Sequence, residues 1–436
     1  MIVEKDIARL SIGSYVVAIV KQSGTQRIKH QGWVKSLRVI ERLIELGVER
    51  VSIDTQKILA SEDSSKEGSN NETHANSTLA PETQEDLSEQ ATEIKTGLNK
   101  LETKESNKGK PKSQLHNRGS KNTAKSLQKA KALFDESKQI QRQIYDDILG
   151  GRQVEFQAVK DITAQTTETI FENPDALACI INIREKDDYL LEHSTSVAIL
   201  ITLFARYLKI DKQTSELLTI GAFLHDVGKI RIADEILNKP GKLTEPEFEI
   251  MKTHVEHSID IITNTRGISE ISLSVAAFHH EKLDGSGYPK GLRADKINQY
   301  GRMITICDIY DALTADRVYK AGIAQVKSFS ILVKMAESNI LDKSLVNSFI
   351  KCMGVFPVGS LVMLSSNQLA VVEQRNDQDP IRPKVKTFYN LSQNHFVGAK
   401  NIDLSDNSNE SIEKGVRANE FDLDMNKILE FLIMDG

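Results

Sequence analysis

Apolar positions recur at the spacing of α-helices over the longest uniform stretch of the chain, from residue 165 to residue 345. Strand-like alternation is missing from this stretch, so it predicts an α-helical bundle. The segments with helical spacing cover residues 177–183, 197–208, 217–224, 248–262, 271–278, 303–313 and 326–336. Together they make the predicted fold class mainly α.

A further helical pattern over residues 121–164 precedes the bundle and is interrupted at Gly150 and Gly151. It predicts a helical connector. Two interpretations of its apolar face remain open: packing on the bundle, or contact with a second copy of the chain in a homodimer.

The two ends of the chain carry shorter apolar runs. Residues 1–57 predict a small α/β unit, with strands over 16–20 and 48–53 and a helix over 36–46 that ends at Gly47. Residues 346–436 predict a small β-rich extension, because short β-like runs alternate there with polar turns. Its segments are strands over 360–364, 369–374 and 384–389, a polar stretch after Leu404 and a helix over 425–434.

Residues 58–120 have a different composition from the rest of the chain. Ser, Asn, Thr, Glu, Gln and Lys dominate, and no aromatic residue occurs between Trp33 and Phe134. Such a stretch cannot bury enough apolar surface to offset its ordering entropy. We therefore expect a disordered polar linker between the N-terminal unit and the connector.

Composition narrows the class of protein. The net charge is −5 and 27% of the 436 residues are charged, so no global basic field favours DNA binding. No apolar run approaches the roughly 18 residues of a membrane helix, and the first residues lack the pattern of a signal peptide. Three widely spaced cysteines argue against a disulfide framework. We expect a cytoplasmic protein.

Candidate chemistry is concentrated in the bundle, where six of the ten histidines fall between His193 and His280. Neutral imidazole is the commonest protein metal ligand, and a carboxylate such as Asp226 can bridge two cations. Asp308 lies in an apolar segment, where an unpaired charge is costly. Two cations about 4 Å apart can activate a water as nucleophile. They can also stabilise the attacking and the leaving oxygen when a phosphoester is hydrolysed. His257, one turn after His254, is interpreted as an ordinary helix residue.

The run His225-Asp226-Val227-Gly228-Lys229 resembles the signature of HD-superfamily metal-dependent phosphohydrolases. With His279-His280-Glu281 and the stretch 284–292, which contains Gly287-Tyr288-Pro289, the chain resembles the HD-GYP subfamily, bacterial cyclic di-GMP phosphodiesterases. The resemblance covers residues 165–345. Residues 1–57 resemble, less specifically, the small domain that often precedes HD-GYP units.

The resemblance implies roles for individual residues. Asp226 and Lys229 would be catalytic, Asp226 by bridging the metals and Lys229 by contacting a substrate phosphate. The implied metal ligands are His193, His225, Asp226, His254, His279, His280 and Asp308. The implied substrate-binding residues are Lys229, Tyr288, Arg317, Gly285, Gly287 and Pro289.

Several roles stay open at this point. Arg317 could contact phosphate or form an ion pair with a neighbour such as Asp311. Glu281 and Asp284 could each support a metal ligand or form the turn. Some trinuclear members of the family carry a glutamate where this chain has Tyr189, so we expect two metal ions instead of three. The five histidines favour iron or manganese over magnesium.

The expected function is hydrolysis of cyclic di-GMP to the linear dinucleotide pGpG, to GMP, or to both, in bacterial second-messenger signalling. One alternative is a signalling module that docks partners such as diguanylate cyclases. Another is a phosphodiesterase that acts on a related cyclic dinucleotide. The motifs specify phosphodiester chemistry and say little about the bases.

Overall fold

The structure is a computed structural model of the chain. The residues it describes are 2–7, 10, 14–23, 32–34, 43–44, 47–54, 121–183, 189–239, 241–315, 322–376, 379–406, 409–421 and 423–434. The chain divides into two compact units, Met1–Leu79 and Ala80–Gly436. The polar linker predicted over 58–120 lies outside the described residues.

The first unit contains an antiparallel sheet with the strand order β1-β4-β2-β3. Its strands are β1 (Ile2–Asp6), β2 (Tyr15–Gln22), β3 (Gly32–Trp33) and β4 (Val48–Asp54). The two predicted strands are confirmed as parts of β2 and β4. Val16 of β2 and Val51 of β4 are fully buried and belong to a small apolar core. The helix predicted over 36–46 lies outside the described residues except for Leu43 and Ile44, which are helical.

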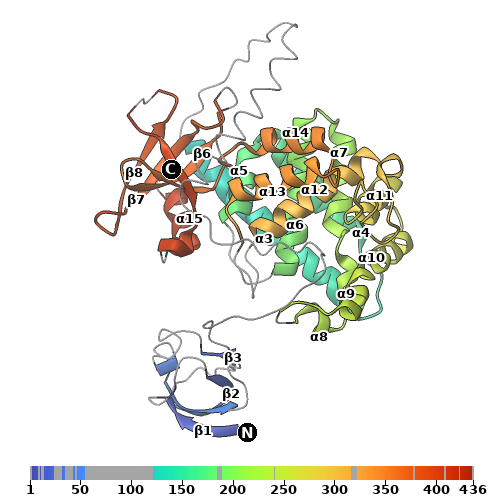
Figure 1. Cartoon of the computed structure of the whole chain (residues 1–436), viewed down its shortest axis with the longest axis horizontal. Helices are drawn as coiled ribbons and strands as arrows, with labels where there is room; N and C mark the ends of the chain where they lie inside the picture. The colour runs from blue at the N-terminus through green and yellow to red at the C-terminus, as the bar shows by residue number, and fades with distance from the viewer. Residues whose placement is uncertain are drawn as a thin grey trace, which may run out of the picture. The chain divides into compact units, whose positions relative to one another are not determined.

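The second unit is mainly α, as predicted, and Figure 1 shows its helices packed around one another. The helices are α3 (Lys121–Leu149), α4 (Phe156–Glu172), α5 (Pro174–Ile183), α6 (Tyr189–Tyr207), α7 (Lys212–Leu224), α8 (Asp234–Leu237), α9 (Glu245–Lys252), α10 (His254–Asn264), α11 (Glu270–Phe278), α12 (Gln299–Thr314), α13 (Gln325–Glu337) and α14 (Lys343–Met353). A 3₁₀ turn, η2 (Val227–Arg231), follows α7. The connector is α3 and α4, and its buried residues join the core of the bundle.

Two helical features differ from the sequence analysis. The single helix expected over 248–262 is two helices, α9 and α10, which meet at Thr253. The Thr253 hydroxyl donates to the Ile250 carbonyl at 2.7 Å, a local bond that competes with helix continuation while the apolar spacing runs on. The break makes His254 the first residue of α10. The second feature is α14, which crosses residue 345, where the predicted bundle ends.

The C-terminal part is an antiparallel sheet with the strand order β8-β7-β6-β5-β9, followed by α15. Its elements are β5 (Leu361–Leu364), β6 (Gln368–Gln374), β7 (Lys384–Asn390), β8 (His395–Asp403), β9 (Ile412–Val416) and α15 (Met425–Met434). The three predicted strands and the helix are confirmed. The edge strands β8 and β9 were not predicted. Most residues of β8 are exposed, so no alternation of apolar and polar residues marks it.

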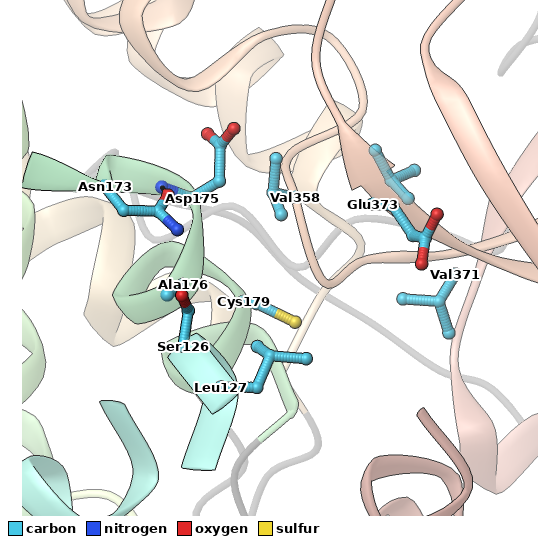
Figure 2. A pocket seen from close by; sticks show the side chains of 10 residues that line it. Ser126, Leu127, Asn173, Asp175, Ala176, Cys179, Val358, Val371 and Glu373 are labelled. Carbon is cyan, nitrogen blue, oxygen red and sulfur yellow. Dashed lines mark hydrogen bonds between the residues drawn. The ribbon is translucent and has the colours of Figure 1, made fainter. Parts of the chain in front are cut away.

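Some apolar residues of this sheet join the core of the bundle, whereas Val362, Val372 and Val385 belong to a separate buried cluster. Leu369, Val371 and Phe388 belong to the same buried cluster as the helices. Where β6 approaches α3 and α5, a cavity of about 40 Å³ remains, and Figure 2 shows the Cys179 sulfur and Glu373 beside it. Burial raises the pKa of Cys179 to about 12 and raises that of Glu373. The cavity has room for only about three waters.

Candidate metal centre

All seven predicted metal ligands converge at one place in the second unit. His193 lies on α6, the pair His225 and Asp226 follows α7, and Asp308 lies on α12. The remaining histidines begin α10 or follow α11; they are His254, His279 and His280. The side chains are almost fully buried, with His280 the most exposed at 24%.

Asp226 stands at the centre of the cluster. Its Oδ1 lies 3.3 Å from His254 Nε2 and 3.7 Å from His279 Nε2. Its Oδ2 lies 3.4 Å from the Nε2 atoms of both His193 and His225. Each carboxylate oxygen therefore faces its own pair of imidazoles, the arrangement that a carboxylate bridge between two cations needs.

Asp308 closes the cluster on another side. Its Oδ1 lies 3.1 Å from His193 Nε2 and its Oδ2 lies 3.3 Å from His280 Nδ1. Three groups of side chains bring one ligand atom each to within 4.8 Å of one another. The groups are His254, His279 and His280; His193, His225 and Asp308; and His225, Asp226 and His279. The first two groups share no residue, so the cluster has ligands for two neighbouring cations.

The backbone orients three of the rings. In each, Nδ1 lies 2.6–2.7 Å from the carbonyl oxygen three residues earlier, so Nδ1 carries the proton and donates it. The pairs are His225 with Ala222, His254 with Met251 and His279 with Ala276. Nε2 of each ring is left as a lone pair directed into the cluster, the tautomer that a metal ligand requires.

His193 is oriented by a carboxylate that the sequence analysis did not assign to the site. Its Nδ1 lies 2.7 Å from Asp311 Oδ2, and both side chains are buried. Burial lowers the pKa of His193, but Asp308 and Asp311 outweigh it and raise the pKa to about 9. The signal was present in the sequence, because Asp311 follows Asp308 by three residues and so shares its face of α12.

Three of the histidines and both carboxylates have the charge states that suit a cation. Burial lowers the pKa of His225 and His279, and lowers that of His280 to about 3, so these rings are neutral. Burial opposes ionisation of Asp226 and Asp308, but Lys229 and histidines outweigh it at Asp226 and histidines alone outweigh it at Asp308, so both carboxyl pKa values are lowered. Neutral imidazoles beside ionised carboxylates are the protonation states in which these groups bind metals.

Two atoms support the same conclusion. His225 Nε2 and Asp226 Oδ1 are buried and have no hydrogen-bond partner among the described residues. Leaving a buried polar atom unpaired costs about 1–3 kcal/mol. A bound cation would satisfy both atoms, so the residues present fit a metal centre. A set of imidazole and carboxylate donors suits first-row transition metals.

Lys229 lies beside this cluster in η2. Its ammonium group donates to Asp226 Oδ2, so a positive charge stands next to the central carboxylate. Gly228 lets η2 approach α10 closely, because a Cβ at Gly228 would lie 2.1 Å from the His254 carbonyl oxygen. The Gly228 amide donates to Ser258 Oγ at 2.8 Å and fastens this contact.

The loop after His280 is held by two acids. Glu281 accepts hydrogen bonds from the amides of Lys290 and Leu292 at 2.8 and 2.7 Å. Asp284 accepts from the amide and hydroxyl of Ser286 at 3.0 and 2.8 Å. Glu281 and Asp284 could support a metal ligand or form the turn, and these contacts favour turn formation.

The glycines of the loop serve it in different ways. Gly285 has a φ of 84°, which favours glycine, whereas Gly287 packs against the loop itself. A Cβ at Gly287 would lie 2.5 Å from the His280 carbonyl oxygen. Tyr288, before a cis bond to Pro289, places its ring 4.6 Å from that of His280.

Some predicted residues are not brought to the site by the described structure. Arg317 lies outside the described residues. The side chain of Tyr189 is not described either. His257, on α10, belongs to none of the three ligand groups.

Helix α3, part of the connector, packs on the bundle as one of the two interpretations predicted, and it also contacts the segments that carry ligands. Gln141 donates from Nε2 to the carbonyl of Phe223 at 2.5 Å, two residues before His225. Lys138 Nζ lies 3.3 Å from Oε1 of buried Glu192, the neighbour of His193. These contacts span 82 and 54 residues of sequence, so no local pattern could reveal them.

Comparison with known families agrees with this geometry. Residues 178–345 match the HD domain family, and residues 2–159 match DUF3391, a domain of unknown function. Residues 178–345 are therefore an HD domain. The paired histidines and the Gly287-Tyr288-Pro289 triplet, which carry the resemblance to the HD-GYP subfamily, lie within this match.

Curated relatives share this region. Cyclic di-GMP phosphodiesterase PA4108 of Pseudomonas aeruginosa is 32% identical over 262 residues, 60% of this chain and 63% of the relative. 3'3'-cGAMP-specific phosphodiesterase 3 of Vibrio cholerae is 37% identical over 161 residues, 36% of this chain and 35% of the relative. A cyclic di-GMP phosphodiesterase of Thermotoga maritima is 45% identical over 98 residues, 22% of this chain and 27% of the relative. The chain thus spans 63% or less of the length of these relatives.

Proposed function

We propose that this chain is a metal-dependent phosphodiesterase that hydrolyses cyclic di-GMP to pGpG, GMP or both. The observation that carries the proposal is the position of Asp226, whose two oxygens face separate pairs of histidines. The relatives named as cyclic di-GMP phosphodiesterases support the choice of substrate.

Two divalent cations, iron or manganese, are the cofactors we propose. One would be held by His193, His225 and Asp308, the other by His254, His279 and His280, with Asp226 between them. When bound, such a pair polarises a phosphoryl oxygen and makes a water nucleophilic at neutral pH. Five imidazoles and two carboxylates make a poor magnesium site, because magnesium prefers oxygen ligands and keeps several waters.

The residues around the cluster define the direction from which substrate arrives. Lys229 and His280 have side chains 16% and 24% exposed, whereas Asp226 and the other histidines are at most 2% exposed. Half-buried Tyr288 lies on the same side, against His280. A phosphodiester therefore reaches the centre past Tyr288 and meets the Lys229 ammonium, a compact cation that neutralises phosphate charge. Gly285, Gly287 and Pro289 shape the loop that carries Tyr288, and Arg317 is proposed as a second phosphate contact.

The test combines metal analysis of anaerobically purified protein with chromatographic measurement of cyclic di-GMP turnover on the same sample. We expect about two metal ions per chain and turnover that Asp226→Ala abolishes. Full activity of Asp226→Ala would refute the mechanism. Protein that stays metal-free after reconstitution would refute the metal centre itself.

Hydrolysis of 3'3'-cGAMP is the second candidate activity, and the Vibrio cholerae relatives with that name favour it. The same assay run with both dinucleotides decides between them by the ratio of kcat/KM. Docking of partners such as diguanylate cyclases would instead leave a cellular phenotype that survives Asp226→Ala. We place the reaction in the cytoplasm, which the three free, buried cysteines support. No described helix is long and apolar enough to span a bilayer.

A further inference from the structure

An exposed aromatic side chain stands beside the proposed entrance to the metal centre. Phe248 on α9 is 39% exposed, and its ring centroid lies 6.2 Å from that of Tyr288 at an interplanar angle of 82°. Single exposed apolar side chains are common on protein surfaces, so exposure alone carries no function. The position of Phe248 relative to the metal ligands is what sets it apart.

A row of rings leads from the ligands to Phe248. The ring of Tyr288 lies 4.6 Å from that of His280 and 6.3 Å from that of His254. Phe248 extends this row away from the cluster. A planar ligand could pack against the faces and edges of these rings. The row begins at His254 and His280, two of the proposed metal ligands.

The ammonium group of Lys252 lies close to the rings of Phe248 and Tyr288. Lys252 Nζ lies 4.9 Å from the centroid of Phe248 and 5.9 Å from that of Tyr288. Glu249 Oε1 holds the ammonium group at 2.6 Å. Because an ammonium group has three donors, this bond leaves Lys252 able to donate to an anionic ligand as well.

The helix that carries Phe248 and Lys252 is anchored at its start. Thr244 and Glu247 form a capping box, and Lys239 Nζ donates to both carboxylate oxygens of Glu247 at 2.7 and 2.5 Å. These contacts fix the first turn of α9, where Phe248 follows Glu247 directly. The aromatic ring is therefore presented by an ordered element, which lowers the entropic cost of binding a ligand.

We propose that Phe248, Tyr288 and Lys252 form a nucleobase subsite, in which one base of a cyclic dinucleotide lies against the Phe248 ring and Lys252 contacts a phosphate. This inference rests on the proposed function, since it concerns how the same substrate is held. Aromatic side chains stack on every base, because each base has a π-face. The subsite thus selects nucleotides over simple phosphodiesters and contributes little to the choice between guanine and adenine.

The test is the kinetics of Phe248→Ala with cyclic di-GMP. Loss of one stacked base should raise KM about tenfold. Chemistry at the metals is unaffected, so we expect kcat to stay within about threefold of the parent and the metal content to be unchanged. Phe248→Trp should restore KM, because it keeps an aromatic face. A KM of Phe248→Ala within twofold of the parent would overturn the subsite.

Ile250→Ala is the matched control. Ile250 lies on the same helix and is 46% exposed, and it has no ring to stack. Its removal should leave KM unchanged, whereas an increase equal to that of Phe248→Ala would show a general effect on α9 and contradict the proposal. Lys252→Met should raise KM and make it less sensitive to salt, because an ionic contact is screened.

If the proposed function itself is wrong, the result differs from the one expected when only the subsite is wrong. In that case the parent does not turn over cyclic di-GMP although it holds metal. Equilibrium binding of cyclic di-GMP and 3'3'-cGAMP to the parent and to Phe248→Ala then tests the subsite alone. Weaker binding by the variant supports the subsite, and equal binding, or no binding to either protein, overturns it.

Discussion

At the scale of single residues, the proposed metal centre depends on the nitrogen that each histidine turns inward. Three backbone carbonyls fix this choice for His225, His254 and His279, and a carboxylate fixes it for His193. A side-chain substitution cannot remove a backbone carbonyl, but it can remove the carboxylate of Asp311. Asp311 is therefore the point at which ligand orientation can be tested.

Asp311→Asn should weaken metal binding about tenfold or more, because residues that orient metal ligands typically contribute this much. The amide is nearly isosteric, but it removes the charge that holds the His193 ring. Competition with a chelator measures the affinity. Asp260→Asn is the control, since it alters an exposed ion pair with Arg231. Equal affinities of the two variants would contradict the role of Asp311.

Gly228 permits the close approach of η2 to α10. Gly228→Ala would place a Cβ 2.1 Å from the His254 carbonyl oxygen, so the two elements must separate. We expect a loss of about 2 kcal/mol in the free energy of unfolding, as in overpacked cores, together with weaker metal binding. Urea unfolding measures the first effect. Gly415→Ala, where a Cβ would meet nothing within 4 Å, should change neither quantity.

At the scale of elements, α3 links two segments that carry ligands. Gln141 holds the end of α7, and Lys138 holds the start of α6 through Glu192. Residues 2–159, which match DUF3391, include α3, whereas the HD match begins only at residue 178. The segments that carry the proposed metal ligands are therefore supported by an element outside the HD domain match.

Gln141→Leu should lower metal affinity and cost about 1–3 kcal/mol of stability, because the buried Phe223 carbonyl loses its donor. Metal titration and denaturant unfolding give the two quantities. Gln143→Leu on the same helix loses only a 2.9 Å bond to Asp147 of α3 itself. If both variants bound metal equally well, α3 would not position the ligands.

At the scale of the whole molecule, the chain consists of two compact units with separate cores, and the proposed metal centre lies in the second alone. The sheet β5–β9 contributes residues to the core of the bundle and belongs to the second unit. Binding of metal stabilises only the folded state that contains the ligands. The two units should therefore respond differently to metal and to core substitutions.

Val51→Asp buries a charge in the core of the first unit and should unfold that unit. We expect metal content to stay at the parent value and the thermal transition of the second unit to remain. Removal of metal by a chelator should lower the Tm of this second transition only. Calorimetry with and without chelator measures both effects, and loss of metal from Val51→Asp would show that the units depend on one another.

The sequence by itself determined the mainly α class, the positions of most helices and all seven proposed metal ligands. Helical periodicity is local, and it was sufficient for α6, α7, α11 and α12. Four of these ligands lie in local motifs, the run from His225 to Lys229 and the paired histidines, whereas His193, His254 and Asp308 followed only from the family resemblance that those motifs support. The spacing of these residues along the chain did not show which carboxylate oxygen faces which imidazole nitrogen.

Only the tertiary structure decided how these residues are arranged. It set Asp226 between two pairs of imidazoles, brought Asp311 to His193, and placed Gln141 of α3 against the end of α7. The edge strands β8 and β9 likewise depend on pairing with distant strands and carry little pattern of their own. The physical reason is the same in each case: local periodicity follows from backbone geometry, whereas contacts between distant segments follow from packing of the whole core.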